Sequence, residues 1–284
     1  MTDNRTRPVA LVTGASSGIG EELARRFADA GHDLVLVARS ADKLQTLARE
    51  LQAQHGIKTL VLAVDLTEPQ APGRLATSLR RRSRVPDVLV NCAGVLAQGP
   101  FAGIQPSGHQ AIIDLNISAL TSMLSHFVPL MTARGSGRVL NVASIAAFQP
   151  VPTLATYAAS KAYVLSLTES LSQELKGSGV SVTALCPGIT ATQMLASATQ
   201  ANQQLASLPG FLIGSVEEVA RQGFEACMRG DVICVPGVLN RAAMIASRST
   251  PKWLMRRVSG LLARKVTWGP SRWLRAASSL DRRS

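Results

Sequence analysis

Short apolar runs alternate along the chain with longer stretches in which apolar residues recur every three or four positions. The short runs are near-continuously apolar, which is typical of strands that are covered on both faces of a sheet. They predict seven strands, at residues 9–12, 33–38, 58–64, 87–91, 137–143, 180–186 and 231–235.

The stretches between the strands have helical spacing. In residues 20–30, Leu23, Phe27 and Ala30 share one face, and Gly31 ends the helix. Ser215 and Glu218 form a capping box that starts a helix running through Met228. Further helices are predicted at residues 41–54, 107–132 and 156–175. This alternation predicts an α/β fold, a Rossmann-like doubly wound parallel sheet of about seven strands with helices on both faces, over residues 1–237.

The helices at 107–132 and 156–175 are long and weakly charged. We expect the sheet to cover one side of each helix and a partner subunit the other, in a homodimer or homotetramer. No apolar run approaches 18 continuous residues, so we expect no helix to span a bilayer. Nor does an apolar stretch precede the first strand, so no signal peptide is predicted. The scattered cysteines favour a cytoplasmic location.

Composition supports an ordered domain, since 46% of the residues are apolar and 17% are charged. The four cysteines are scattered and have no histidine cluster nearby, so neither a disulfide nor a metal site is expected.

The net charge of +12 is concentrated at the C-terminal end of the chain. Residues 241–284 hold eleven Lys or Arg and one Asp, a balance of +10 that leaves +2 to the first 240 residues. We therefore expect residues 238–284 to form a basic helical extension. Its apolar stripe and three tryptophans suit peripheral contact with an anionic membrane; packing on the domain or on another subunit is the alternative. Nucleic-acid binding is not expected, because no reading motif is present. The stripe comprises Leu254, Val258, Leu261, Leu262 and Lys265.

A glycine-rich turn joins the first strand to the first helix, in the sequence Thr13-Gly-Ala-Ser-Ser-Gly-Ile-Gly20. Glycines there permit a tight turn and let backbone N–H groups approach a pyrophosphate at the helix N-terminus. A strand before the turn and a helix after it make a dinucleotide site more plausible than an ordinary loop.

The spacing of these glycines resembles that of the short-chain dehydrogenase/reductase family, and the resemblance extends from about Pro8 to about Gly237. Further matches are Asp65-Leu66, Asn91-Cys-Ala-Gly94 (with Cys92 in place of a second Asn) and Pro187-Gly-Ile-Thr-Ala-Thr192. The resemblance and the glycine turn together imply dinucleotide contacts from Gly14, Ser16, Ser17, Gly18, Ile19, Gly20, Arg39, Ser40, Asp65, Leu66, Asn91, Ala93, Gly94, Tyr157, Lys161, Pro187, Gly188, Ile189, Thr190 and Thr192.

The end of the second strand bears on the choice of nicotinamide cofactor. NAD enzymes usually place an acidic residue there, to bind the ribose 2′-hydroxyl. This sequence has Arg39 and Ser40 instead, and a guanidinium is a bidentate donor for a 2′-phosphate. NADP(H) is therefore favoured over NAD(H), although Arg39 could also be a solvated surface residue.

Tyr157 and Lys161 lie four residues apart on a predicted helix, hence on one face, and Ser144 follows the fifth strand. A phenol has a pKa near 10, which a neighbouring ammonium and a nicotinamide cation should lower toward neutrality. Tyr157 is then the general acid or base, and Ser144 hydrogen-bonds the substrate oxygen. Order and spacing resemble the family's triad, and the resemblance adds Asn116 as a fourth catalytic residue that anchors a water. Alternatively, Asn116 is an ordinary amide within a helix.

These features predict an oxidoreductase that transfers a hydride between NADP(H) and a carbonyl or secondary alcohol, with Ser144 and Tyr157 contacting the substrate. Residues 194–214 are apolar and uncharged, which favours a hydrophobic substrate, unless they are core or dimer contacts. The alternative function is a catalytically idle dinucleotide sensor or scaffold.

Overall fold

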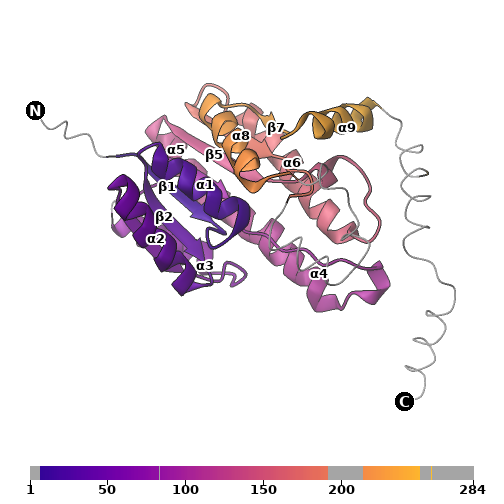
Figure 1. The fold of residues 1–284 in the computed structure, drawn as a ribbon, viewed down its shortest axis with the longest axis horizontal. Helices are drawn as coiled ribbons and strands as arrows, with labels where there is room; N and C mark the ends of the chain where they lie inside the picture. The colour runs from indigo at the N-terminus through magenta and orange to yellow at the C-terminus, as the bar shows by residue number, and fades with distance from the viewer. Residues whose placement is uncertain (1–6, 83, 191–213, 250–256, 258–284) are drawn as a thin grey trace, which may run out of the picture.

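The computed structural model describes residues 7–82, 84–190, 214–249 and 257. At its centre is one sheet in which every neighbouring pair of strands is parallel, in the order β3-β2-β1-β4-β5-β6-β7 (Figure 1). All seven predicted strands are confirmed, with ends within two residues of those expected. Their bounds are β1 Val9–Thr13, β2 Asp33–Ala38, β3 Thr59–Ala63, β4 Val88–Asn91, β5 Gly137–Val142, β6 Val180–Leu185 and β7 Ile233–Cys234.

Helices cover both faces of the sheet, as the doubly wound prediction requires. One face packs against α1 (Gly18–Asp29), α2 (Ala41–His55) and α8 (Val216–Arg229). The other face packs against α3 (Ala71–Arg81), α5 (Leu120–Arg134) and α6 (Ala155–Glu174). Each layer has its own apolar core.

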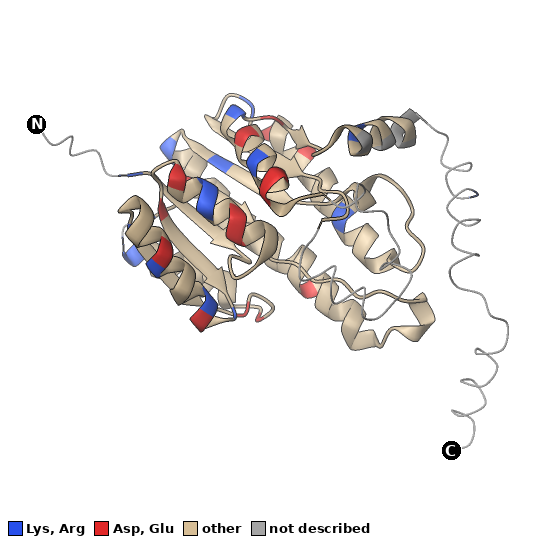
Figure 2. Cartoon of the chain, viewed as in Figure 1, with Lys and Arg blue, Asp and Glu red and all other residues tan. Residues whose placement is uncertain are grey.

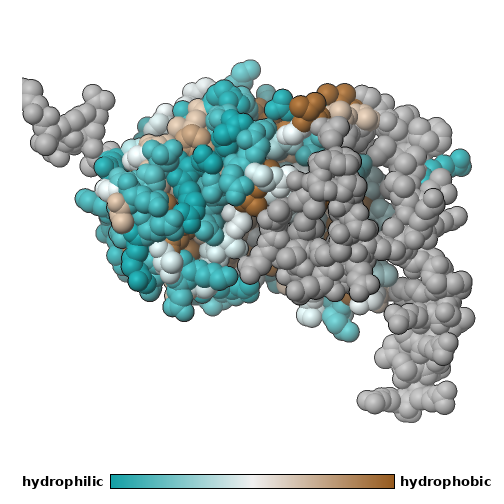
Figure 3. All heavy atoms as spheres, in the orientation of Figure 1, coloured by the Kyte–Doolittle hydropathy of each residue, from teal (hydrophilic) through white to brown (hydrophobic). Residues whose placement is uncertain are grey.

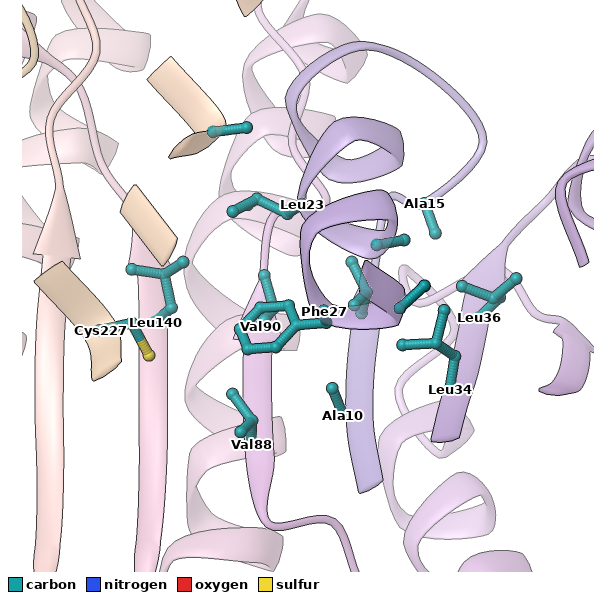
Figure 4. Packing of buried hydrophobic residues seen from close by; sticks show 14 of the residues in the cluster. Ala10, Ala15, Leu23, Phe27, Leu34, Leu36, Val88, Val90, Leu140 and Cys227 are labelled. Atoms are coloured by element: carbon teal, nitrogen blue, oxygen red, sulfur yellow. The ribbon is translucent and has the colours of Figure 1, made fainter. Parts of the chain in front are cut away.

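In the first core, Phe27 of α1 lies over the sheet beside Val88 and Val90 of β4 (Figure 4). Alternate residues of the strands point to opposite faces, so Val12 joins this core and Leu11 joins the second. Both faces being buried explains why the strands are apolar throughout.

Helix α3 is an element that the sequence analysis did not predict. Its eleven residues include Pro72 and Gly73 near the start and three arginines, and only the apolar residues on its inner face are buried. Because the apolar face of α3 is short, the spacing of its apolar residues was too weak to predict a helix.

The helical run from Pro106 to Arg134 comprises α4 (Pro106–Ile113), a π-helical segment η2 (Asp114–Ala119) and α5. By length and mean hydropathy (1.3 over its most apolar window) it could cross a membrane, which counting continuous apolar residues did not anticipate. In this fold, Met123, Phe127 and Met131 of the run are buried against the sheet.

The cap of α8 matches its prediction in part. Ser215 Oγ accepts a hydrogen bond from the backbone N–H of Glu218 (3.1 Å), as a capping box requires. The Glu218 carboxylate binds Arg221 and Gln222 instead of returning to the cap.

The remaining elements lie beyond the carboxyl ends of the strands. They are η1 (Phe101–Gly103), η3 (Ile145–Phe148) and α9 (Val238–Ser249), which packs on η3. The basic extension is thus helical over its first twelve residues. The stripe expected at Leu254–Lys265 lies outside the described residues.

Candidate active site

The glycine-rich turn after β1 is shaped by close backbone contacts. Gly14 has a φ of +69°, and a Cβ there would lie 2.9 Å from the backbone of Ala93. A Cβ on Gly20 would lie 2.3 Å from the carbonyl oxygen of Gly14. Only glycine therefore fits at both positions, and the turn packs directly against the chain that leaves β4.

Ser17 is the N-cap of α1, yet its side chain makes no capping hydrogen bond. Among the described residues, no partner binds the hydroxyl of Ser16 or Ser17. The helix N-terminus thus presents its N–H groups together with two uncommitted hydroxyls, as a phosphate site would require.

Thr13 fixes this turn to the neighbouring strand. Its hydroxyl donates to the carbonyl oxygen of Val90 (3.2 Å) and accepts from the backbone N–H groups of Cys92 (3.0 Å) and Ala93 (3.1 Å). These bonds join β1 to β4, where the strand order reverses and open α/β sheets bind their ligands.

The residues at the ends of β2 and β3 lie near one another. The pKa of Asp65 is lowered mainly by hydrogen bonds from Thr67. The charge of Arg39, which is exposed, makes a smaller contribution in the same direction. Asp65 Oδ1 accepts from both the backbone N–H and the hydroxyl of Thr67 (2.9 and 2.7 Å), so it anchors a turn. Leu66 is buried in the second core, and Ser40 caps α2 without a side-chain bond.

Asn91, expected at the cofactor, has its side chain in the sheet interior. Its Nδ2 donates to Asn141 Oδ1 (2.9 Å), and Asn141 Nδ2 donates to Thr168 Oγ1 (3.0 Å). This buried chain of amides and hydroxyl fastens α6 to β5 and β4. The sequence pattern did not predict these contacts of Asn141 and Thr168, and the only signal for them was a polar residue within an apolar strand or helix.

Asn116 is completely buried in the π-helical segment. Its carboxamide makes two bonds with the backbone of Val95 (2.9 Å each), and its Nδ2 also donates to Ser160 Oγ (3.0 Å). Ser160 in turn donates to the carbonyl oxygen of Tyr157 (2.7 Å). The side chain of Asn116 therefore holds the loop after β4 against the helix that carries Tyr157. π-bulges of this kind recur at functional sites.

Ser144, Tyr157 and Lys161 meet at the carboxyl edge of the sheet. Ser144 is the N-cap of η3, two residues after the end of β5, and its Oγ accepts a hydrogen bond from the backbone N–H of Ala146 (3.1 Å). Lys161 Nζ donates to the carbonyl oxygen of Val142 (2.8 Å), the last residue of β5, and lies 5.7 Å from the ring centroid of Tyr157. A Cβ on Gly94 would lie 3.6 Å from the same Nζ, so the loop after β4 closes the other side.

The pKa of Tyr157 departs from the expected direction. Burial raises it, and a hydrogen bond with Ser144 offsets part of the rise. Burial also lowers the pKa of Lys161 to about 8, and no ion pair among the described residues involves this lysine. Desolvation of the phenol therefore outweighs the hydrogen bond with Ser144. The expected lowering by Lys161 together with a nicotinamide cation stays a prediction.

The Pro187–Thr190 stretch continues from β6 beside Ser144. The backbone N–H of Ile145 donates to the Pro187 carbonyl oxygen (2.9 Å), and Thr190 Oγ1 donates to that of Gly188 (3.1 Å). Thr192 and residues 194–213 lie outside the described residues.

A family model described as short chain dehydrogenase matches residues 8–203. The chain belongs to the short-chain dehydrogenase family. The seven-stranded parallel sheet, the glycine turn and the convergence of Ser144, Tyr157 and Lys161 agree with this membership.

Two solved structures are similar to this chain in fold and sequence. A short-chain dehydrogenase from Sphingobium yanoikuyae in complex with NADPH has a TM-score of 0.77 and 33% identity, over 90% of this chain and 95% of that one. A bulky-bulky ketone specific alcohol dehydrogenase from Comamonas testosteroni has a TM-score of 0.73 and 28% identity, over 87% of this chain and 96% of that one.

Among curated relatives, the glycine betaine reductase ATRR of Emericella nidulans is 37% identical over 193 residues, 68% of this chain. The match spans only 15% of that relative's length.

Proposed function

We propose that this protein is an NADP(H)-dependent carbonyl reductase or alcohol dehydrogenase. The observation that carries the proposal is the meeting of Ser144, Tyr157 and Lys161 at the carboxyl edge of the sheet, beside the glycine turn. A general acid, an oxygen-binding hydroxyl and a buried ammonium are the groups that reduction of a carbonyl needs.

The turn fits a dinucleotide pyrophosphate on steric and polar grounds. The space that a Cβ would occupy at Gly14 and Gly20 is taken by backbone, which keeps the turn tight. Within the described part of the chain, no group hydrogen-bonds to the hydroxyls of Ser16 and Ser17 at the N-terminus of α1. Arg39 and Ser40 would hold the 2′-phosphate, and this supports NADP(H) over NAD(H). The chemistry such a dinucleotide supplies is hydride transfer.

The protein's side chains supply the proton. Tyr157 donates its phenolic proton to the substrate oxygen as negative charge develops there, and Ser144 donates a hydrogen bond to the same oxygen. The raised pKa of Tyr157 keeps the phenol protonated at neutral pH, as a proton donor must be. Lys161, with a pKa of about 8, stabilises the phenolate left behind and returns a proton to it.

A hydrophobic carbonyl or secondary alcohol is the proposed substrate class. Residues 194–214 contribute Leu, Phe and Ile without any charged side chain. The specificity of the Comamonas testosteroni enzyme for bulky ketones supports this proposal.

The test is a panel of ketones, aldehydes and secondary alcohols assayed with NADPH and NADH in parallel. We expect turnover with bulky apolar carbonyls and a preference for NADPH. Tight NADPH binding without turnover of any member of the panel would contradict the proposal and favour a dinucleotide sensor.

We further propose a cytoplasmic homodimer or homotetramer. Charged residues gather over α1, α2 and α8, whereas α4 and α6 carry few (Figure 2). Apolar residues also lie exposed on α9, where Val238 is 82% and Ile245 60% accessible (Figure 3).

Light scattering would give the subunit number. Co-sedimentation with anionic vesicles, with and without residues 250–284, would test membrane contact.

A further inference from the structure

The first turn of α9 reaches into the candidate active site. A Cβ on Gly188 would lie 2.5 Å from Asn240 Nδ2, 2.7 Å from its Oδ1 and 2.9 Å from its Cγ. The three atoms nearest to that position all belong to Asn240, so a side chain at residue 188 would have to displace this carboxamide. Gly188 is not among the glycines with a positive φ, so the backbone itself would accept alanine there.

The carboxamide of Asn240 is held in this position. Its Nδ2 donates to the carbonyl oxygen of Pro236 (2.8 Å), across the turn that Gly237 makes with a φ of +84°. Beside it, Arg241 Nε donates to the carbonyl oxygen of Val235 (3.1 Å), immediately after β7. Moving the carboxamide away from Gly188 would therefore break a hydrogen bond.

The segment that Asn240 contacts belongs to the candidate active site. Pro187 accepts the backbone N–H of Ile145, the residue after Ser144, and Ile189 accepts the N–H of Gly214 (2.8 Å). Asn240 at Gly188 is thus a third contact that holds this segment, after those at Pro187 and Ile189. Helix α9 itself packs on η3.

We propose that Asn240 is a positioning residue for the segment Pro187–Thr190, and that the first turn of α9 is part of the active-site wall. This rests on the proposed function, since the segment is expected to hold the nicotinamide end of the dinucleotide. The contact fixes where the segment lies relative to Ser144, and misplacement on the scale of an ångström is enough to slow catalysis severely.

The test compares Gly188→Ala, Asn240→Ala and the double variant in the full-length protein. We expect Gly188→Ala to weaken NADPH affinity and lower kcat, each roughly tenfold, because the new methyl group displaces the segment. Asn240→Ala should lower kcat roughly tenfold and change NADPH affinity by less than about threefold. In the double variant the methyl group occupies the space vacated by the carboxamide, so NADPH affinity should recover to that of Asn240→Ala.

Ala242→Gln is the matched control, because Ala242 lies exposed on the same helix and glutamine is also a good helix former. It should leave NADPH affinity, kcat and the thermal midpoint unchanged. Losses that simply add in the double variant would overturn the inference, because the contact would then not be what excludes a side chain at residue 188.

Thermal unfolding of the wild type, the two single variants and the double variant separates the role of Asn240 from the proposed function. Non-additive midpoints for Gly188→Ala and Asn240→Ala are expected whether or not a dinucleotide binds. A wild-type protein that fails to bind NADPH would overturn the proposed function and, with it, the active-site role of Asn240. A wild type that binds NADPH, with fully additive variants, would overturn the role of Asn240 alone.

Discussion

The ammonium of Lys161 donates a hydrogen bond to the carbonyl oxygen of Val142, 2.8 Å away, in a place where only 6% of the lysine is exposed. Burial disfavours the charged ammonium, and no ion pair with another described residue offsets this cost, so the pKa of Lys161 falls to about 8. The nearest thiol groups do not supply a negative charge, since burial raises the pKa of Cys92 and of Cys186 to about 12.

Replacement of Lys161 by Met should change how stability depends on pH. The folded pKa of about 8 lies below the ordinary value of about 10.4, so between these pH values the unfolded chain binds more protons and wild-type stability rises with pH. Below pH 8 the cost of burying the charge is fully present. The stability of Lys161→Met relative to wild type should therefore fall from pH 8 to 10.4 in urea unfolding. Lys176→Met, at an exposed position, should show no such trend.

Removal of the Tyr157 hydroxyl should abolish turnover. Tyr157→Phe keeps the ring but loses the proton donor, so kcat should fall by roughly a thousandfold or more. NADPH affinity, measured by fluorescence titration, should stay within about threefold of the wild-type value, because the glycine turn and Arg39 are unchanged. Activity near that of wild type would refute the assignment of the general acid.

Reversal of charge at Arg39 should exchange the cofactor preference. In Arg39→Asp a carboxylate would repel the 2′-phosphate and could accept from a ribose 2′-hydroxyl, so we expect kcat/KM for NADPH to fall by roughly a hundredfold and that for NADH to rise. Arg49→Asp makes the same charge change on the exposed side of α2 and should alter neither ratio. An equal effect of both variants would mean that only long-range charge matters.

Breaking the polar chain in the sheet interior should destabilise the fold. Asn141→Leu removes the acceptor of Asn91 Nδ2 and the donor to Thr168, leaving buried polar atoms unpaired. The free energy of unfolding should fall by about 2–4 kcal/mol. Thr168→Val interrupts only one of the two links and should cost less. Chemical denaturation of both variants tests the order, and a fully stable Asn141→Leu would contradict it.

Thr153 is the one described residue other than glycine with a positive φ, at 70°. It lies between Ser144 and Tyr157, and its carbonyl oxygen accepts the N–H of Gly99 (2.9 Å). A β-branched residue is strained in this conformation, so Thr153→Gly should raise the free energy of unfolding by about 0.5–1 kcal/mol. Thr77→Gly in α3 should lower it. A fall in activity of Thr153→Gly despite greater stability would show that the strain serves the site.

The sequence predicted the sheet well because strands buried on both faces have an unmistakable apolar pattern. It missed α3, whose apolar face is short, and it anticipated a lower pKa for Tyr157 because burial cannot be read from spacing. Asn141–Thr168 and Asn116–Ser160 are contacts between residues 27 and 44 positions apart, and Asn240–Gly188 spans a similar gap, so no local pattern encodes them.

The hydroxyl of Thr13 makes hydrogen bonds to three backbone groups at the carboxyl end of β4. These bonds hold β1 to β4 at the point where the strand order reverses. They join the half of the chain that carries the glycine-rich turn to the half that carries Ser144, Tyr157 and Lys161. Hinge motion between these halves would have to break all three bonds together. Under the proposed function, the separation between the glycine turn and Tyr157 would therefore stay constant, and adaptation to different substrates would fall to segments away from these bonds.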